Sequence, residues 1–411
     1  MKRIWILSER YFPEQTSTGY FLTKIAEGLA EEYNLKVITG PATKSLLPCE
    51  GLPKHEVRNK VEIWRCKGTI FNQNLLLGFF LNGVTRSVAI FWKTLFLCQR
   101  EDTILVVTTS SLLPFVALII KWLKRIQVVL LIHDVFPEAL IAAGLCQPSS
   151  IIVRIGQVMN RILYSHSSKI VTLGRDMTRL TLAKLSDKDE NKIVCIHNWA
   201  DNQIVRPTKK ANNPKLKELG VADKFVVLYA GNIGRCHGIE YVAEAAKILQ
   251  KNENIHFIIS GFGYKKKWLE QYVMSNNLEN VNILNRCPSH ELIIVLNACD
   301  LAIISYIPGM AGVSVPSRMY NQMAAGKPIL AVADDWSELA QVVKEEEIGW
   351  VVEPGDVEGL VRTIELAAAA PDLCFQMGAK AAAVAQNKYD FNQANQGYKK
   401  LFSELLESQL G

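Results

Sequence analysis

The chain has 411 residues, of which 49% are hydrophobic and 21% are charged. This length predicts two domains, or three, and the apolar content excludes disorder over most of the chain. The net charge is +6, and its excess lies in residues 1–200, which carry 25 Lys and Arg against 16 Asp and Glu. That half either attracts an anionic membrane or substrate, or its charges are merely solvated.

The nine cysteines predict neither a disulfide framework nor structural zinc, because their number is odd and no C-x-x-C or His/Cys cluster occurs. Their usage fits a reducing cytoplasm. No signal peptide is expected, since the apolar run Ile4–Leu7 is too short. Leu75–Cys98 and Ile104–Leu131 are apolar but interrupted by polar residues, so neither is expected to span a membrane.

Short apolar runs alternate with longer amphipathic ones in the first half, which predicts a parallel sheet with crossover helices. Arg3–Leu7 is expected to form the first strand and Thr18–Glu32 the helix after it. The continuous apolar character of the strands indicates burial on both faces of the sheet. The further strands expected here are Lys36–Thr39, Thr103–Val107, Gln127–Ile132, Lys169–Thr172 and Lys192–Cys195.

A boundary is predicted at residues 201–220, which are polar and contain Pro207 and Pro214, as a linker with a short helix. The alternation then restarts, so two doubly wound domains fit better than one large sheet. Asn392–Leu406 is expected to form a final amphipathic helix. The strands expected in the second half are Phe225–Tyr229, Ile255–Ser260, Val281–Leu284, Leu301–Ser305, Pro328–Val332 and Gly349–Val352.

Ligands of doubly wound sheets bind beyond the carboxyl ends of the strands. After the first strand, Gly19 either lets the backbone approach a phosphate or sugar, or marks an ordinary junction between loop and helix. His133 follows the strand Gln127–Ile132, beside Asp134 and Glu138. It either bonds sugar hydroxyls and stabilises charge, or is a structural His beside a capping acidic pair. The absence of G-x-G-x-x-G argues against a dinucleotide dehydrogenase.

Two strands of the second half are each followed by a Gly-rich turn and a cation. The first turn, from Gly231 to Gly238, contains Arg235, which can bind phosphate oxygens. The second turn runs from Gly261 to Tyr264 and precedes three lysines. Each turn either lets the backbone approach a phosphate closely or is a tight turn followed by solvated cations.

The loop from Gly309 to Arg318 precedes an expected helix, Met319–Ala325. Backbone N–H groups at a helix N-terminus beside an Arg form a diphosphate-binding arrangement. The alternative is a flexible surface loop. The concentration of polar residues at the start of the helix favours the binding site.

The order of these motifs resembles the family-4 glycosyltransferases, which are retaining enzymes of the GT-B fold. The resemblance covers nearly the whole chain and is closest to bacterial enzymes that build surface polysaccharides. The motifs that carry it are YFPEQTSTGYFLTKIAEGLAE, IHDVFPEAL, VLYAGNIG with HGIEYVAEAAKIL, FIISGFG, PSRMYNQMAAGKPILAV and GWVVEPGD.

The resemblance implies an α/β architecture of two Rossmann-like domains facing across a cleft. Residues 1–200 would bind the acceptor, residues 201–390 the donor, and residues 391–411 would form a helix that packs back on the first domain. The expected catalytic residues are His133, Arg235 and Arg318. The expected acceptor-side residues are Glu14, Asp134 and Glu138. The expected donor-binding residues are Thr18, Gly19, Gly231, Asn232, His237, Gly261, Gly263, Tyr264, Cys287, Ser314, Val315, Pro316, Ser317 and Asn321.

The sequence departs from the family at two pairs of positions. Where many relatives carry an Arg and a Lys that grip the diphosphate, this chain has Asn232 and His237, so Arg235 or Arg318 is expected to supply the charge. Where relatives carry two Glu separated by seven residues, this chain has Val313 and Asn321. Asn321 could still bond a ribose, but as an amide.

The expected activity is transfer of a hexose from a UDP- or GDP-linked donor to a glycan or polyprenyl-linked acceptor, with retention and without metal or cofactor. The enzyme is expected in the cytoplasm, at the inner face of the membrane. A nucleotide-sugar epimerase of the same fold and a degenerate sugar-nucleotide-binding scaffold stay open as alternatives. A nucleic-acid partner is not expected, because the basic excess lacks interleaved aromatic residues.

The apolar stretch Leu75–Leu97 has two readings. With Arg86, Lys93 and Arg100 nearby, it suits contact with an anionic membrane. The alternative, which we favour at this point, is a buried pair of helices in the first domain.

Overall fold

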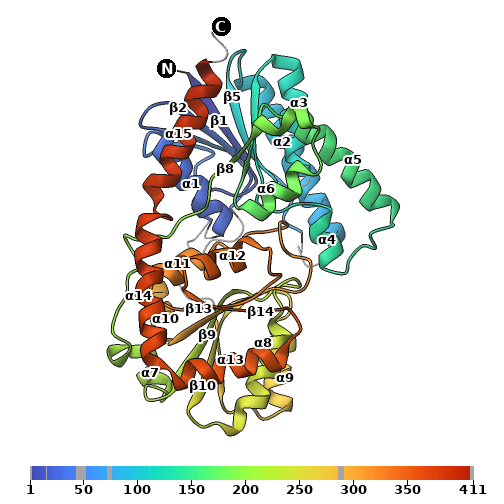
Figure 1. Cartoon of the computed structure of the whole chain (residues 1–411). Helices are drawn as coiled ribbons and strands as arrows, with labels where there is room; N and C mark the ends of the chain where they lie inside the picture. Colours follow the sequence, from blue (N-terminus) through green and yellow to red (C-terminus); the bar gives the residue numbers. More distant parts are fainter. Residues whose placement is uncertain are drawn as a thin grey trace. The chain divides into compact units, whose positions relative to one another are not determined.

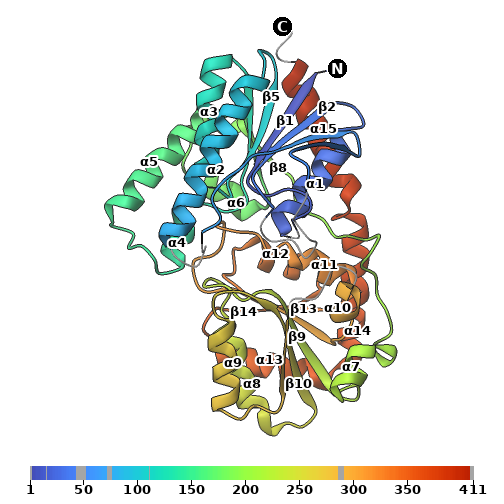
Figure 2. The ribbon, with the colours of Figure 1, turned by 180° about the vertical axis from the view of Figure 1, so that it is seen from behind.

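The computed structural model describes residues 2–14, 16–42, 52–71, 76–110, 112–285 and 291–407. The chain divides into two compact units (Figures 1 and 2). The first unit comprises Met1–Leu140, Cys146–His197 and Ala394–Gly411, and the second comprises Ile141–Leu145 and Asn198–Gln393. Each is an α/β domain built on one sheet.

The sheet of the first unit has the order β3-β4-β2-β1-β5-β6-β7-β8, and only β3 runs antiparallel to its neighbour. Its central strands are buried along their length because helices cover both faces of a doubly wound sheet. The strands are β1 (Arg3–Ser8), β2 (Asn34–Thr39), β3 (His55–Arg58), β4 (Val61–Arg65), β5 (Thr103–Val107), β6 (Gln127–Leu131), β7 (Lys169–Thr172) and β8 (Ile193–Cys195).

The helices of the first unit connect these strands, and α15 adds the end of the chain to it. They are α1 (Ser17–Leu29), α2 (Leu76–Leu97), α3 (Leu113–Lys124), α4 (Glu138–Ala142), α5 (Ile151–His166), α6 (Arg175–Leu182) and α15 (Phe391–Glu407). Lys399 of α15 pairs with Glu31 and Glu32, just after α1, at 3.1 and 2.8 Å. The final helix therefore packs on the first unit, where Figure 1 shows it beside α1.

The second unit holds a fully parallel sheet of order β11-β10-β9-β12-β13-β14. Its strands are β9 (Phe225–Asn232), β10 (Ile255–Phe262), β11 (Val281–Leu284), β12 (Leu301–Ser305), β13 (Ile329–Val332) and β14 (Gly349–Val352). The helices are α7 (Pro214–Leu219), α8 (Ile239–Ile248), α9 (Lys266–Ser275), α10 (Leu292–Leu296), α11 (Arg318–Ala324), α12 (Glu338–Glu345), α13 (Val357–Ala369) and α14 (Pro371–Asn387).

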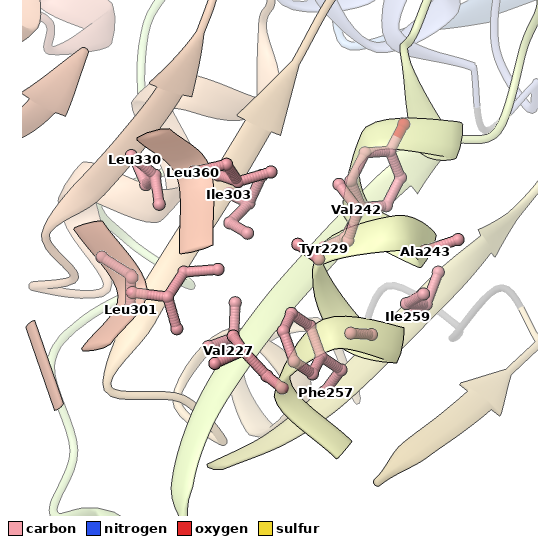
Figure 3. Packing of buried hydrophobic residues seen from close by; sticks show 14 of the residues in the cluster. Val227, Tyr229, Val242, Ala243, Phe257, Ile259, Leu301, Ile303, Leu330 and Leu360 are labelled. Atoms are coloured by element: carbon pink, nitrogen blue, oxygen red, sulfur yellow. The ribbon is translucent and has the colours of Figure 1, made fainter. Parts of the chain in front are cut away.

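Figure 3 shows one face of this sheet packed against helices. Val227 and Tyr229 of β9 lie with Phe257 of β10 and Ile303 of β12, and α8 and α13 cover them. Each side chain is at most 1% exposed. Burial of such side chains contributes roughly 1.5–3 kcal/mol each and fixes the ends of the strands, where the candidate site lies.

Two expectations need correction in these elements. The described part of this apolar stretch does not form a pair of helices, since Leu76–Leu97 is one continuous helix of 22 residues. The sequence also did not predict β3 and β4. Both alternate between more and less exposed residues at the edge of the sheet, so they lack the continuous apolar run by which the central strands were found.

β9 and β10 are longer than expected, and the last two residues of each include a glycine that was assigned to a loop. Gly231 pairs with Gly261, and Asn232 pairs with Phe262, in parallel register. A Cβ atom at position 261 would overlap the carbonyl oxygen of Gly231. Glycine at 261 therefore permits the two strands to stay paired up to the site.

We expect Gly261→Ala to prevent stable folding of the second unit or to lower its free energy of unfolding by several kcal/mol, because the overlap is with backbone. The matched control is Gly220→Ala, where φ is +68° but nothing lies within 4 Å of the added Cβ. Its cost should be about 1–2 kcal/mol. Denaturant unfolding measures both, and equal losses would contradict the close approach.

Candidate functional site

Arg318 begins α11 in the second unit, and its guanidinium lies at the carboxyl ends of β9 and β12. One Nη donates to the carbonyl oxygen of Ser305 at 3.1 Å. The guanidinium carbon lies 4.8 Å from the ring centre of Tyr229 and 5.8 Å from that of Tyr306. A Cβ at Gly231 would lie 2.9 Å from Nη1, so glycine makes room for the cation. Nη1 itself is buried and makes no hydrogen bond.

His237 lies in the same part of the second unit. Its ring centre is 5.5 Å from that of Tyr306, and a Cβ at Gly234 would lie 2.9 Å from its Nδ1. Nδ1 is buried without a hydrogen-bond partner. Burial, followed by the positive charges of Arg318 and Lys265, lowers the pKa of His237 to about 3. The imidazole is therefore neutral at pH 7, with one nitrogen available as a donor.

Arg235 follows β9 and stacks on Tyr264, which follows β10, with 3.4 Å between the guanidinium carbon and the ring centre. A Cβ at Gly263 would lie 2.7 Å from the side-chain oxygen of Asn232. The predicted residues of the first two turns therefore do gather at the adjoining ends of β9 and β10. Stacking holds Arg235 without neutralising its charge.

The loop before α11 is ordered by an acidic side chain that the sequence did not single out. The backbone N–H groups of Gly309, Met310 and Ala311 donate to Oδ2 of Asp334, at 3.0, 3.1 and 3.1 Å. These three donors are thus not available to a diphosphate, but the N–H groups on which the expectation rested are different ones, at the start of α11. α11 has only seven residues, so the Arg318 side chain, rather than the helix end, is the main cationic feature.

The other residues of the second unit that were predicted to bind the sugar donor differ in burial and in contacts. The side-chain oxygen of Asn321 accepts the backbone N–H of Asp201 at 3.0 Å, so this oxygen serves the fold. Val313 is 2% exposed and belongs to the core. Val315 and Pro316 are buried, Ser314 and Ser317 are half-buried. Cys287 lies outside the described residues.

The side chain of His133 contacts one other predicted residue of the first unit. Its Nδ1 lies 3.3 Å from Oγ1 of Thr18 on α1, next to Gly19, and its backbone N–H donates to Oγ1 of Thr108 at 3.1 Å. Its Nε2 is buried without a hydrogen-bond partner. Burial lowers the pKa of His133 to about 4, so it is neutral at pH 7. A neutral imidazole at a strand end, with one ring nitrogen unpaired, can form a hydrogen bond with a hydroxyl group.

The three acidic residues predicted on the acceptor side differ in role. Glu138 pairs with Lys184 after α6 at 2.7 Å, which indicates a structural ion pair rather than a free acceptor-side carboxylate. Glu14 is 5% exposed, and its backbone N–H donates to the carbonyl oxygen of Tyr11. The backbone carbonyl of Asp134 accepts from Oγ1 of Thr108 at 2.9 Å.

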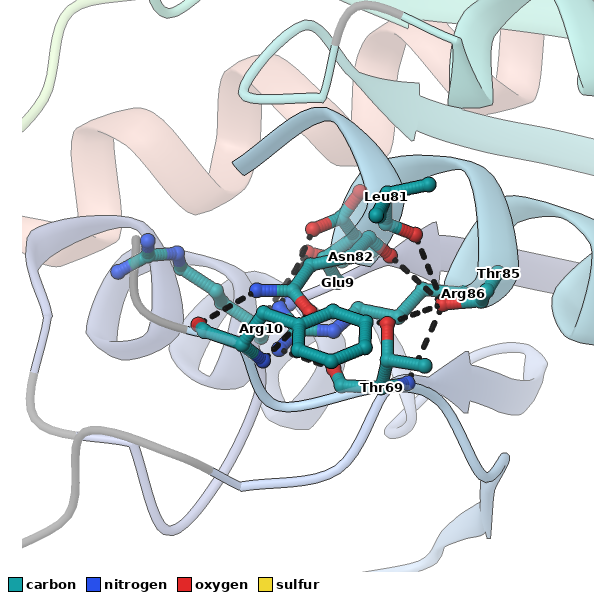
Figure 4. A network of polar contacts seen from close by, with 9 residues as sticks. Glu9, Arg10, Thr69, Leu81, Asn82, Thr85 and Arg86 are labelled. Carbon is teal, nitrogen blue, oxygen red and sulfur yellow. Dashed lines mark hydrogen bonds and ion pairs between the residues drawn. The ribbon is translucent and has the colours of Figure 1, made fainter. Parts of the chain in front are cut away.

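A polar network that sequence reasoning missed lies at the carboxyl end of β1 (Figure 4). Arg86, on the inner face of α2, reaches Glu9 at 3.5 Å and donates to the carbonyl oxygen of Thr69 at 3.2 Å. Asn82 accepts from Oγ1 of Thr69 and from the N–H of Phe71, both at 2.9 Å. Oε1 of Glu9 is buried without a hydrogen-bond partner. The network therefore ties α2 to the loop after β1.

Comparison with known proteins places the chain in a family. A model described as glycosyl transferases group 1 matches residues 213–384. The probable glycosyltransferase WbjE of Pseudomonas aeruginosa is 31% identical over 365 residues, which cover 89% of each chain. The chain belongs to this family of glycosyltransferases. WcaI of Escherichia coli K12, whose name assigns it to colanic acid biosynthesis, is 27% identical over 90% of this chain and 93% of that protein.

Two solved structures show the fold of this glycosyltransferase. Sucrose-phosphate synthase of Thermosynechococcus elongatus matches with a TM-score of 0.80 and 16% identity, over 99% of this chain and all of that one. HepE of Anabaena, solved in complex with UDP-glucose, matches with a TM-score of 0.74 and 16% identity over 98% of this chain. The fold is GT-B, with two Rossmann-like domains, as the sequence predicted.

Two further properties concern the described residues only. Within them, no helix is both long enough and apolar enough to cross a bilayer. In the same part of the chain, no three His, Cys, Asp or Glu side chains gather in an arrangement that would hold a metal ion.

We expect Asp334→Asn to loosen the loop before α11, because the amide offers one neutral acceptor in place of a carboxylate that receives three N–H groups. Loss of about 2 kcal/mol of hydrogen bonding should speed hydrogen exchange of residues 309–311 roughly 30-fold. The control is Asp335→Asn, which removes an exposed ion pair with Lys344. Equal exchange in both variants would contradict this role of Asp334.

His133 makes the first unit sensitive to acid. Its folded pKa of about 4 lies below its ordinary value of 6.5, so protons bind the unfolded chain more tightly and stability falls as the pH drops through this range. Between pH 7 and pH 5 the loss should be about 2 kcal/mol. Denaturant unfolding of wild type and His133→Gln at both pH values measures it. Between pH 7 and pH 5, the free energy of unfolding of His133→Gln should fall by about 2 kcal/mol less than that of wild type. Equal falls in the two proteins would contradict the role of His133 in acid sensitivity.

Proposed function

We propose that this glycosyltransferase moves a hexose from a UDP- or GDP-linked donor to a glycan or polyprenyl-linked acceptor, with retention of configuration and without a metal ion or cofactor. The carrying observation is Nη1 of Arg318, a cationic donor that is buried beside Gly231 and left without a partner. Buried hydrogen-bond donors in native proteins are almost always paired with an acceptor. An unpaired one therefore indicates that its acceptor belongs to a ligand. A diphosphate supplies an anionic acceptor of the right kind.

The neighbours of Arg318 support the same ligand. His237 adds a second buried nitrogen without a partner, and Arg235 adds a cation held on Tyr264. Arg235 and His237 come from the segment that follows β9, and Arg318 comes from the start of α11. Together they would supply the contacts that the family resemblance assigns to an Arg and a Lys at positions 232 and 237. HepE, of similar fold, is known in complex with UDP and UDP-glucose, which favours a nucleotide-sugar ligand here as well.

The proposed chemistry places charge stabilisation on the leaving group. As the bond between the sugar and the diphosphate breaks, negative charge grows on the diphosphate, and Arg318 and Arg235 would stabilise it. Neutral His237 would donate one further hydrogen bond. The departing phosphate oxygen would take the proton of the acceptor hydroxyl. In the first unit, Nε2 of neutral His133 would bond a sugar hydroxyl.

The acceptor proposal rests on the relatives and on the first unit. WcaI carries a name from colanic acid biosynthesis, which supports a role in building surface polysaccharide. The basic excess of residues 1–200 supports catalysis at the cytoplasmic face of an anionic membrane, contacted through the first unit.

The test is turnover of a panel of UDP- and GDP-hexoses with a soluble acceptor analogue, with proton NMR to assign the anomer formed. We expect transfer with retention that is unaffected by chelator, and a fall in kcat/KM of about 100-fold or more in Arg318→Ala. Arg362→Ala is the control, because Arg362 is an exposed arginine of the same unit. An epimerised donor formed without acceptor would contradict the proposal, as would nucleotide binding without any turnover.

A further inference from the structure

Helix α5 of the first unit turns an apolar face away from the protein. Ile151, Ile155, Val158 and Ile162 recur at spacings of four, three and four residues, which places them on one side of a helix. All four are exposed, between 48% and 73%. The buried residues of α5 are instead Val153, Leu163 and Tyr164, on the opposite side. A surface helix normally shows the reverse arrangement, with its apolar stripe towards the core.

Helices α2 and α3 continue this apolar surface. α2 packs against α3, and α3 packs against α5, and both ribbon views show the three on the same side of the first unit (Figures 1 and 2). On α2, Trp92 and Phe96 are 52% and 78% exposed, and on α3, Trp122 is 81% exposed. We define the apolar helix surface by six residues: Trp92, Phe96, Ile119, Trp122, Ile155 and Ile162.

The charges of these helices have one sign. None of α2, α3 and α5 contains an Asp or Glu. Their basic residues are Arg86, Lys93, Lys121, Lys124, Arg154 and Arg161, and Arg125 follows α3. Arg86 is turned inward to Glu9, whereas Arg154 and Arg161 are exposed beside the apolar stripe of α5. The surface therefore combines exposed apolar side chains and tryptophans with cations alone.

This combination of apolar side chains and cations indicates which partner the apolar helix surface can bind. A second copy docked by the same surface would set Arg154 and Arg161 of each chain near like charges, with no acidic residue on these helices to compensate. An anionic bilayer complements both features, since its interior accepts the apolar side chains and its headgroups pair with the cations. Exposed tryptophans favour the boundary between the two.

We propose that the first unit docks on an anionic lipid bilayer through the apolar helix surface, with Arg154 and Arg161 against the lipid phosphates. The proposal rests on the proposed function, because it identifies the membrane at which a polyprenyl-linked acceptor would be met. The inner face of α2 supports this link. It is tied through Arg86 and Glu9 to the carboxyl end of β1, where acceptors of such sheets bind.

The test is co-sedimentation of the full chain with vesicles of phosphatidylcholine alone or mixed with phosphatidylglycerol. We expect the mixed vesicles to bind at least about tenfold more tightly, with an affinity that falls as salt rises. Ile155→Asp with Ile162→Asp should lower that affinity by about tenfold or more. Arg154→Glu with Arg161→Glu should do the same on the mixed vesicles, and this pair changes exposed residues whose loss should not disturb folding.

Two matched controls lie in the second unit. Phe375→Asp introduces an acid at an apolar residue that is 78% exposed, and Arg362→Glu reverses an exposed charge. Both should bind vesicles like wild type. Equal binding to the two vesicle types would overturn the proposal, as would a wild-type dimer in light scattering that the Ile155 and Ile162 changes dissociate. Transfer to a soluble acceptor analogue should be unchanged in the docking variants, which separates a failure of docking from a failure of the proposed function.

Discussion

The second unit depends on keeping a guanidinium in place with one of its donors unsatisfied. Leaving a buried charged donor without a partner costs at least about 1–3 kcal/mol, which a fold retains only where the neighbouring contacts compensate. Here Tyr229 and Tyr306 hold Arg318 by ring contacts, and the carbonyl of Ser305 takes one Nη. Gly231 leaves the space that a side chain would fill. The uncompensated donor is the one that we assign to the ligand.

Each unit has a neutral, buried histidine after the end of a strand. His133 and His237 are both buried enough to stay neutral at pH 7, and each keeps a ring nitrogen without a hydrogen-bond partner. A neutral imidazole can donate to or accept from hydroxyl groups and phosphate oxygens without carrying charge into the core. In the second unit, Arg318 and Lys265 reinforce this state by lowering the pKa of His237 further.

Much of the fold could be predicted because the central strands are continuous apolar runs, and every strand expected from such a run is present. β3 and β4 were not predicted because their residues alternate between more and less buried and form no continuous apolar run. Site residues that follow strands could be found from position, as Arg235 and Tyr264 show. The contacts that fix the site are long-range and leave no local pattern. Asp334 lies more than twenty residues beyond the three N–H groups that it accepts, and Glu9 meets Arg86 from a distant part of the first unit's sequence.

The most direct test of the central claim is calorimetric titration with a nucleoside diphosphate and with the matching nucleoside, using wild type, Arg318→Ala and the control Arg362→Ala. If Arg318 receives the diphosphate, wild type and the control should prefer the diphosphate over the nucleoside by 100-fold or more, roughly what two charge-assisted contacts supply. Arg318→Ala should lose most of that preference while keeping its weak affinity for the nucleoside. A preference that survives intact in Arg318→Ala would contradict the assignment of the diphosphate to this guanidinium.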